Sequence, residues 1–169
     1  MWQKFLQWLE KQVFVASVPD IPMTIKPVLP APNVDVIDPD WSEPSNAYHN
    51  TRVICDQVGL SLDQKNILCA CVFQESGFLT NPRPNQNKDP QTGKVWSTDY
   101  GICQINDYFH IGPHKDFPSV QYVIDNPEAC ILWMARIYKK TGNLNPWGSF
   151  STGAYKVWLP SSSPMWKLK

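Results

Sequence analysis

Closely spaced prolines divide this chain near its N-terminus. Proline lacks an amide hydrogen and clashes with the preceding helical turn, so a continuous helix cannot cross such a segment. We therefore predict an extended, polyproline-like linker over residues 19–45, and a single packed domain over residues 46–169. The hydrophobic content of 43% is sufficient for one domain with a core. The prolines of the linker are Pro19, Pro22, Pro27, Pro30, Pro32, Pro39 and Pro44.

Residues 1–18 are expected to form a short amphipathic helix or anchor. The segment is too short and too polar to span a bilayer, and Glu10 and Lys11 interrupt the apolar run that a signal peptide requires. Its expected docking sites are, in order, its own domain, a protein partner within a larger assembly, and a membrane surface. Its apolar residues are Trp2, Phe5, Leu6, Leu9, Val13 and Phe14.

A capping pattern marks the best-defined helix. Ser61 is followed three residues later by Gln64, which is typical of a capping box, and Gly77 is a suitable left-handed stop. Further helices are expected over residues 46–58, from Pro127 to about Thr141, and over residues 146–150, with 154–159 as a further candidate. Together these elements predict a mainly α (α+β) domain.

Glu75 falls in the last turn of the capped helix. It lies three and four residues after the apolar Val72 and Cys71, which places it on the inward face. Burial and the negative end of the helix dipole both disfavour a carboxylate, so we expect the pKa of Glu75 to be raised. The alternative is an ordinary exposed glutamate at a helix end.

The segment after this helix is rich in turn-forming residues. Residues 81–93 read Asn-Pro-Arg-Pro-Asn-Gln-Asn-Lys-Asp-Pro-Gln-Thr-Gly, and we interpret them as a β-hairpin wing that ends at residues 94–96. Asp99 is then expected in a polar turn. One protonated acid and a second carboxylate are what cleavage of a glycosidic bond requires.

Two segments carry a resemblance to a known family. Glu75-Ser-Gly-Phe78 and Ser97-Thr-Asp-Tyr-Gly-Ile-Cys-Gln-Ile-Asn106 resemble the signature of the lysozyme superfamily, and the second is close to the chicken-type pattern S-T-D-Y-G-I-x-Q-I-N. Glu75-Ser76, residues 101–105 and residues 150–153 also resemble the E-S, G-x-x-Q-[ILM] and A-Y-N-A-G motifs of soluble lytic transglycosylases. The third match is poor, since Phe150 and Ser151 replace Tyr and Asn. The resemblance covers residues 46–159.

The resemblance implies a lysozyme-like fold and a set of roles. Glu75 would be the general acid, and Asp99 the nucleophile or charge stabiliser, although the separation of 99 − 75 = 24 residues is longer than in animal lysozymes. Trp147 would pack over Glu75, or would be a core residue; Tyr155 would lie near the cleft floor, or would be a core tyrosine. The expected substrate-binding residues are Ser76, Tyr100, Gln104, Asn106, Trp147 and Tyr155.

The expected function is cleavage of the β-1,4 bond between N-acetylmuramic acid and N-acetylglucosamine in peptidoglycan. The alternatives are lytic transglycosylation, which gives 1,6-anhydromuramyl products, and a non-catalytic lysozyme-like binding or structural domain. Peptidoglycan glycan strands are the expected partner, and action on the cell wall is expected from a periplasmic, extracellular or virion-associated location. The formal net charge of zero disfavours nucleic-acid binding.

The cysteines form an odd set at spacings unlike the disulfide framework of animal lysozymes. They are interpreted as buried free thiols, with one or two disulfides as the alternative. No cofactor or metal site is expected, because the Cys69-Ala-Cys71 spacing does not suit metal ligation. The five residues are Cys55, Cys69, Cys71, Cys103 and Cys130.

Overall fold

The computed structural model describes residues 37–38 and 40–160, so the predicted N-terminal helix and most of the linker lie outside the described residues. The described chain combines helices with a small antiparallel sheet of order β1-β2-β3, which confirms the mainly α (α+β) class. The elements are α2 (Pro44–Val58), α3 (Leu62–Ser76), β1 (Asn85–Lys88), β2 (Val95–Tyr100), β3 (Ile105–Asn106), α4 (Asp107–His110), α5 (Val120–Asp125), α6 (Pro127–Thr141), α7 (Gly148–Ser151) and the 3-10 helix η1 (Ala154–Trp158).

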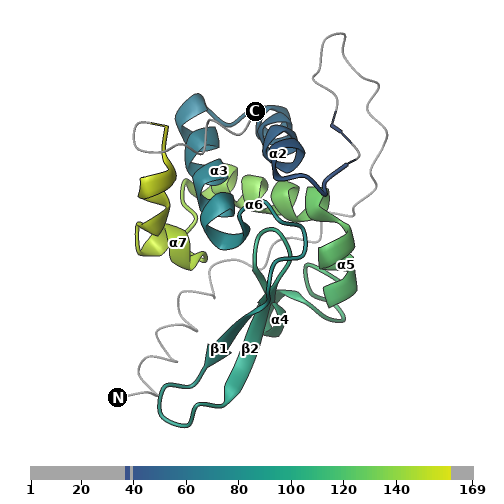
Figure 1. Cartoon of the computed structure of the whole chain (residues 1–169), viewed down its shortest axis with the longest axis vertical. Helices are drawn as coiled ribbons and strands as arrows, with labels where there is room; N and C mark the ends of the chain where they lie inside the picture. Colours follow the sequence, from purple (N-terminus) through teal and green to yellow (C-terminus); the bar gives the residue numbers. More distant parts are fainter. Residues whose placement is uncertain (1–36, 39, 161–169) are drawn as a thin grey trace. The chain divides into compact units, whose positions relative to one another are not determined.

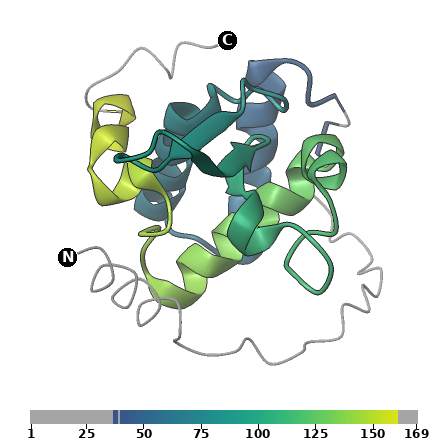
Figure 2. The ribbon, with the colours of Figure 1, turned by 90° about the horizontal axis from the view of Figure 1, so that it is seen from below.

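The helices and the sheet occupy different parts of the domain. Helices α2, α3 and α6 lie together, and the β1–β2 hairpin extends away from them beside α4 (Figure 1). Helix α3 packs against α2, α7 and η1, whereas β2 packs against α4 and α5. Seen from below, the yellow C-terminal helical turns and the green α5 lie on opposite sides of the strands (Figure 2).

Helix α3 begins and ends where its caps predict. The Ser61 side chain accepts a hydrogen bond from the backbone N–H of Gln64 at 3.3 Å, and the Gln64 side chain accepts from the Ser61 N–H at 3.0 Å. Gly77 ends the helix in the left-handed region at φ 64°. Likewise, α6 begins at Pro127 and ends before Gly142. These signals are local, so they act independently of the rest of the fold.

The domain begins earlier than the predicted boundary at residue 46. Helix α2 starts at Pro44, and Ile37 and Trp41 pack against the core. The Asp38 backbone N–H donates to Asn50 Oδ1 at 2.9 Å, and Asn50 Nδ2 donates to the Asp38 carbonyl oxygen at 2.7 Å. Because these tertiary contacts hold the segment, the predicted linker extends too far into the domain.

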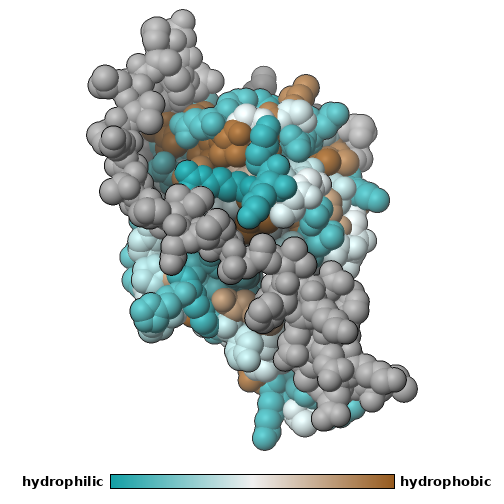
Figure 3. All heavy atoms as spheres, turned by 180° about the vertical axis from the view of Figure 1, so that it is seen from behind, coloured by the Kyte–Doolittle hydropathy of each residue, from teal (hydrophilic) through white to brown (hydrophobic). Residues whose placement is uncertain are grey.

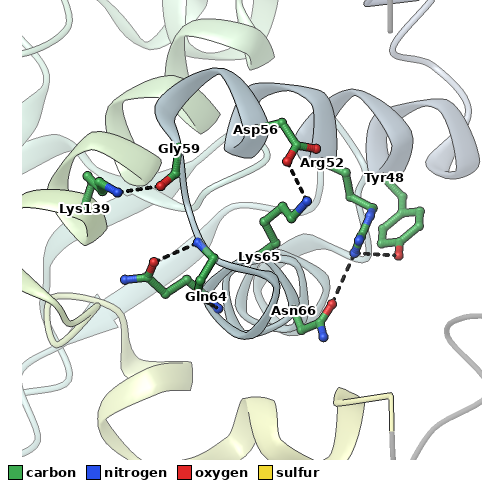
Figure 4. A network of polar contacts seen from close by, with 9 residues as sticks. Tyr48, Arg52, Asp56, Gly59, Gln64, Lys65, Asn66 and Lys139 are labelled. Carbon is green, nitrogen blue, oxygen red and sulfur yellow. Dashed lines mark hydrogen bonds and ion pairs between the residues drawn. The ribbon is translucent and has the colours of Figure 1, made fainter. Parts of the chain in front are cut away.

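Polar contacts join α2, α3 and α6 at the surface of the helical layer (Figure 4). Lys65 forms an ion pair with Asp56, and Arg52 donates to Asn66 Oδ1 at 3.2 Å. Lys139 donates to the carbonyl oxygen of Gly59, just after α2 ends. These contacts orient the first two long helices, of which the second carries Glu75.

The five cysteines are buried free thiols, so that interpretation is confirmed and no disulfide links them. Burial raises the pKa of Cys69, Cys71 and Cys130 to about 12, and it raises the pKa of Cys55 and Cys103 as well. Thiols that stay protonated and buried are poor nucleophiles. They act here as small apolar residues that pack beside fully buried side chains such as Leu68, Ile131 and Met134.

The wing is a hairpin, but its second strand is longer than expected. Strand β2 runs from Val95 to Tyr100, and Asp99 pairs with both Asn85 on β1 and Asn106 on β3. The prediction of Asp99 in a polar turn is therefore wrong. Asp and Asn are depleted in strands, and it is the cross-strand pairing of polar partners that keeps this segment extended.

The C-terminal helical turns are shorter than predicted. Helix α7 begins at Gly148, two residues later than expected, and the segment from Ala154 is a 3-10 helix that ends at Trp158.

None of the described helices combines the length and apolar character needed to cross a bilayer. On the face shown in Figure 3, hydrophilic and hydrophobic side chains are interspersed.

Candidate active site

Glu75 lies in the last turn of α3 and is half-buried. Its Oε1 atom accepts a hydrogen bond from the backbone N–H of Ser149 in α7 at 3.2 Å. Its Oε2 atom has no hydrogen-bond partner among the described residues. One oxygen of the carboxyl group is therefore held by the protein, and the other remains available for proton transfer.

A short segment joins the Glu75 helix to the turn that follows β2. Trp147 is buried, and its indole N–H donates to the carbonyl oxygen of Cys103 at 2.8 Å. Its ring also lies 5.6 Å from that of Trp133 in an edge-to-face arrangement. Two residues later, Ser149 binds Glu75. Residues 147–149 thus connect α3 to the segment that carries Asp99.

Trp147 therefore has a packing role, which was one of the two interpretations of it. Its single N–H donor is already bonded to the Cys103 carbonyl oxygen, and its ring is buried. Contact between this side chain and substrate remains a prediction. The hydroxyl group of Ser149 is also buried, and it has no hydrogen-bond partner of regular geometry among the described residues.

Asp99 is surrounded by the side-chain amides of three asparagines. Asn85 Nδ2 donates to Oδ2 at 2.9 Å, and Asn87 Nδ2 lies 3.0 Å from both oxygens. Asn106 Nδ2 donates to Oδ1 at 2.7 Å. Carboxyl oxygens accept such N–H groups, so neutral amide donors hold both oxygens of Asp99 in place. We refer to Asn85, Asn87 and Asn106 as the amide ring.

Ser97 supports the amide ring from the same strand as Asp99. Its Oγ atom accepts from Asn87 Nδ2 at 3.0 Å and from Asn106 Nδ2 at 2.9 Å. The Oδ1 atom of Asn106 accepts from the backbone N–H of Phe109 and so caps α4. Asn106, which was predicted to bind substrate, is therefore engaged in positioning Asp99 and α4.

Asn85 and Asn87 were missed as site residues from the sequence. Their signal is their alternation along β1, which matches the alternation of Ser97 and Asp99 along β2. Residues two apart on a strand face the same way, so two such pairs meet only if the strands pair in this register. The turn-rich composition of residues 81–93 concealed that strand.

The other predicted substrate-binding residues have structural contacts. The Ser76 hydroxyl donates to the Val72 carbonyl oxygen and accepts from the Phe78 N–H, so it closes the end of α3. Tyr155 is buried with its ring stacked on Phe150 at 5.3 Å, and burial raises its pKa.

Gln104 and Tyr100 flank the turn after β2. Gln104 adopts a positive φ of 49°, and its side chain donates to the Gly101 carbonyl oxygen at 3.1 Å. Tyr100 is half-buried and pairs with Ile105 across the sheet. Glu75 is thus linked to the segment that carries Trp147, through Ser149, and Asp99 is bonded to Asn106. Gln104 follows Cys103, whose carbonyl oxygen binds Trp147, in the turn between β2 and β3. Direct substrate contacts of these residues remain predictions.

The described residues contain no cluster of three His, Cys, Asp or Glu side chains arranged to hold a metal ion.

A comparison with protein-family models found no match for this chain. A comparison with curated proteins also found no match. The chemistry of the site therefore has to be argued from its own residues.

Proposed function

We propose that this chain is a peptidoglycan glycosidase that cleaves the β-1,4 bond between N-acetylmuramic acid and N-acetylglucosamine. Glu75 is the general acid that protonates the leaving oxygen and then the base that deprotonates the attacking group. Asp99 stabilises the oxocarbenium-like charge or acts as the nucleophile. Retaining and inverting glycosidases both depend on two carboxyl groups whose environments assign them different roles.

The observation that carries the proposal is the contrast between the two carboxyl groups. Glu75 is half-buried at the end of a helix, where the dipole disfavours negative charge, and a single backbone N–H holds one of its oxygens. Asp99 accepts hydrogen bonds from three amides. One oxygen of Glu75 is thus left to exchange a proton with substrate, whereas both oxygens of Asp99 are held in place by the amide ring.

Proton transfer follows from the free oxygen of Glu75. In its protonated form, the hydrogen can reside on Oε2 while Oε1 keeps its bond to Ser149. The leaving oxygen then receives that proton as the glycosidic bond breaks, and the resulting carboxylate accepts a proton from the attacking group in the next step. Asp99 supplies the negative charge that the sugar cation needs between these steps.

Hydrolysis and transglycosylation differ in what attacks the sugar cation. Water attacks in the first, whereas the substrate's own 6-hydroxyl attacks in the second. The amide ring favours hydrolysis as the proposed outcome, because it holds in place a second carboxyl group, which the lysozyme route uses. The proposed site of action is the cell wall, with residues 1–18 as a candidate contact to a protein partner.

Product analysis tests this proposal. Purified peptidoglycan incubated with the full chain is expected to yield muropeptides with reducing ends, detected by mass spectrometry before and after borohydride reduction. Products that carry only 1,6-anhydro ends would assign the chain as a lytic transglycosylase. An absence of any cleavage product would instead favour a non-catalytic, glycan-binding domain.

Asp99→Asn is expected to lower peptidoglycan turnover by about 100-fold or more, because a neutral amide cannot stabilise the developing positive charge. The new NH₂ group would also face the donors of the amide ring, so some thermal stability should be lost. Turnover and melting temperature should be measured together.

Asp107→Asn is the matched control for this variant. Within the described part of the chain, Asp107 Oδ1 accepts only the Thr98 backbone N–H, at 2.9 Å, and an amide oxygen can replace it. The control should therefore remain active. Turnover of Asp99→Asn close to that of the control would remove Asp99 from the mechanism.

A further inference from the structure

Trp96 occupies an irregular position in the hairpin. Asn87 pairs with Ser97, but the next residue, Lys88, pairs with Val95, so Trp96 is the extra residue of a β-bulge. A bulge breaks the alternation of side chains along a strand and redirects the side chain at that point. The neighbouring Ser97 and Asp99 keep their regular alternation.

The indole of Trp96 is directed toward two aromatic side chains of α4. Its ring centroid lies 6.1 Å from that of Tyr108 and 6.2 Å from that of Phe109, and the latter two rings are 5.0 Å apart. All three pairs meet edge to face. The exposed fractions are 49% for Trp96, 62% for Tyr108 and 40% for Phe109. We call these three residues the aromatic platform.

The same hydrogen bonds that hold Asp99 also hold the elements that carry the platform. Trp96 directly precedes Ser97, whose hydroxyl accepts hydrogen bonds from Asn87 and Asn106. Asn106 binds Asp99 and also caps α4, the helix that carries Tyr108 and Phe109. A ligand on the platform would thus be held at a fixed position relative to the proposed charge stabiliser.

Lys115 fixes the backbone beneath the platform. Its Nζ atom donates to the carbonyl oxygens of Asp107 and Tyr108, and it lies 5.8 Å from the centre of the Tyr108 ring. These contacts, together with the contacts between the rings, restrict the Tyr108 side chain before any ligand arrives. A surface that is already ordered loses less conformational entropy on binding.

The size of the platform selects its ligand. Three aromatic side chains at about half exposure present roughly 300 Å² of surface. A stable protein–protein contact buries about 800 Å² on each partner, which these rings alone do not provide. A pyranose ring is of the right size, since its apolar C–H face can lie on an aromatic ring while its hydroxyls remain in water.

We propose that the aromatic platform is a saccharide-binding subsite, in which Trp96 stacks on a sugar ring of the glycan. This sugar is not one of the two joined by the cleaved bond, but lies further along the glycan chain. The proposal rests on the proposed function for the nature of the glycan. On this view, the bulge contributes to the subsite because it changes the direction of the strand at the residue that carries the indole. Trp96 is then a specificity residue that favours longer glycans over short ones.

The test is the affinity for the N-acetylglucosamine hexamer, measured by calorimetry and by tryptophan fluorescence with the full chain. Glu75→Gln serves as the background, so that the probe is not cut. Trp96→Ala is expected to weaken binding by about tenfold, which matches the loss of one good stacking contact. Trp96→Phe should recover most of the affinity, since it restores an aromatic face.

Val95→Ala is the matched control. Val95 adjoins Trp96 on the same strand and is 46% exposed, but it is not part of the platform. It should leave the hexamer affinity unchanged. In the active chain, Trp96→Ala should raise KM for glycan strands and leave kcat near its original value, because Trp96 does not touch the reacting atoms.

The outcomes separate this proposal from the proposed function. If Trp96→Ala and Val95→Ala bind the hexamer within about twofold of each other, the platform proposal is wrong, even if Glu75→Gln abolishes turnover. If Trp96→Ala weakens binding while Glu75→Gln still cleaves peptidoglycan, the platform stands and the proposed mechanism fails. Absence of both hexamer binding and turnover overturns both. A Trp96-dependent dimer in sedimentation, with unchanged hexamer affinity, would also overturn the platform.

Discussion

Glu75→Gln is expected to lower peptidoglycan turnover by about 100- to 10,000-fold, because the amide cannot donate the proton that the leaving oxygen needs. The change is nearly isosteric, and the amide oxygen can still accept the Ser149 N–H that now binds Oε1. The fold should therefore be retained. Release of soluble muropeptides measures the activity, and a thermal melt monitored by circular dichroism measures the fold.

The control for Glu75 is Glu128→Gln. Glu128 is an exposed carboxylate in the first turn of α6, and its removal costs only a weak interaction with the helix dipole. This variant should retain wild-type turnover. If Glu75→Gln were as active as the control, Glu75 would not be the acid. Equal and negligible turnover in wild type and in both variants would instead mean that the domain is not an enzyme.

Gly101→Ala is expected to destabilise the domain by about 2–4 kcal/mol, since two separate costs combine. Gly101 has a φ of +70°, a region that residues with a side chain rarely adopt. An added Cβ would also lie 2.7 Å from Val123 Cγ1 and 3.1 Å from the Val123 carbonyl oxygen. Urea unfolding monitored by tryptophan fluorescence gives the change in free energy.

Gly93→Ala separates the two costs. Gly93 has nearly the same backbone angle, at φ +69°, but a Cβ there would meet nothing within 4 Å. It should lose only about 1–2 kcal/mol, which is the cost of the left-handed backbone for a residue with a side chain. Equal losses in the two variants would show that the contact with Val123 is not tight.

The position of Gly101 connects this stability effect to the site. It follows Asp99 by two residues, and its carbonyl oxygen accepts hydrogen bonds from both the backbone and the side chain of Gln104. A shift of this turn would move the end of β2, and with it the carboxylate that the amide ring holds. Gly101→Ala is therefore expected to reduce turnover in the fraction of molecules that remain folded.

The sequence predicted those parts of the fold that depend on neighbouring residues. The cap formed by Ser61 and Gln64, the stop at Gly77 and the start at Pro127 are each defined within a few positions, and all were confirmed. The position of Glu75 in the last helical turn follows directly from the first two. The wing was predicted as a hairpin from its turn-forming residues, although its second strand extends beyond the predicted end, to Tyr100.

The errors arose where contacts between distant segments override local preference. Asn50 holds Asp38 against α2, which moves the start of the domain ahead of the predicted boundary. Strand β2 includes Asp99 because strands on both sides offer it amide donors. Neither result can be read from composition, since Pro, Asn and Asp by themselves favour turns and linkers.

The sequence by itself determined the helical class, the helix that carries Glu75, and the presence of a hairpin wing, because capping and turn signals act over a few residues. Only the tertiary structure decided what surrounds each group. The bond between Ser149 and Glu75 spans 74 residues, and the bond between Trp147 and Cys103 spans 44. The amide ring and the aromatic platform depend in the same way on strand register and on one bulge, which arise only when the strands pair.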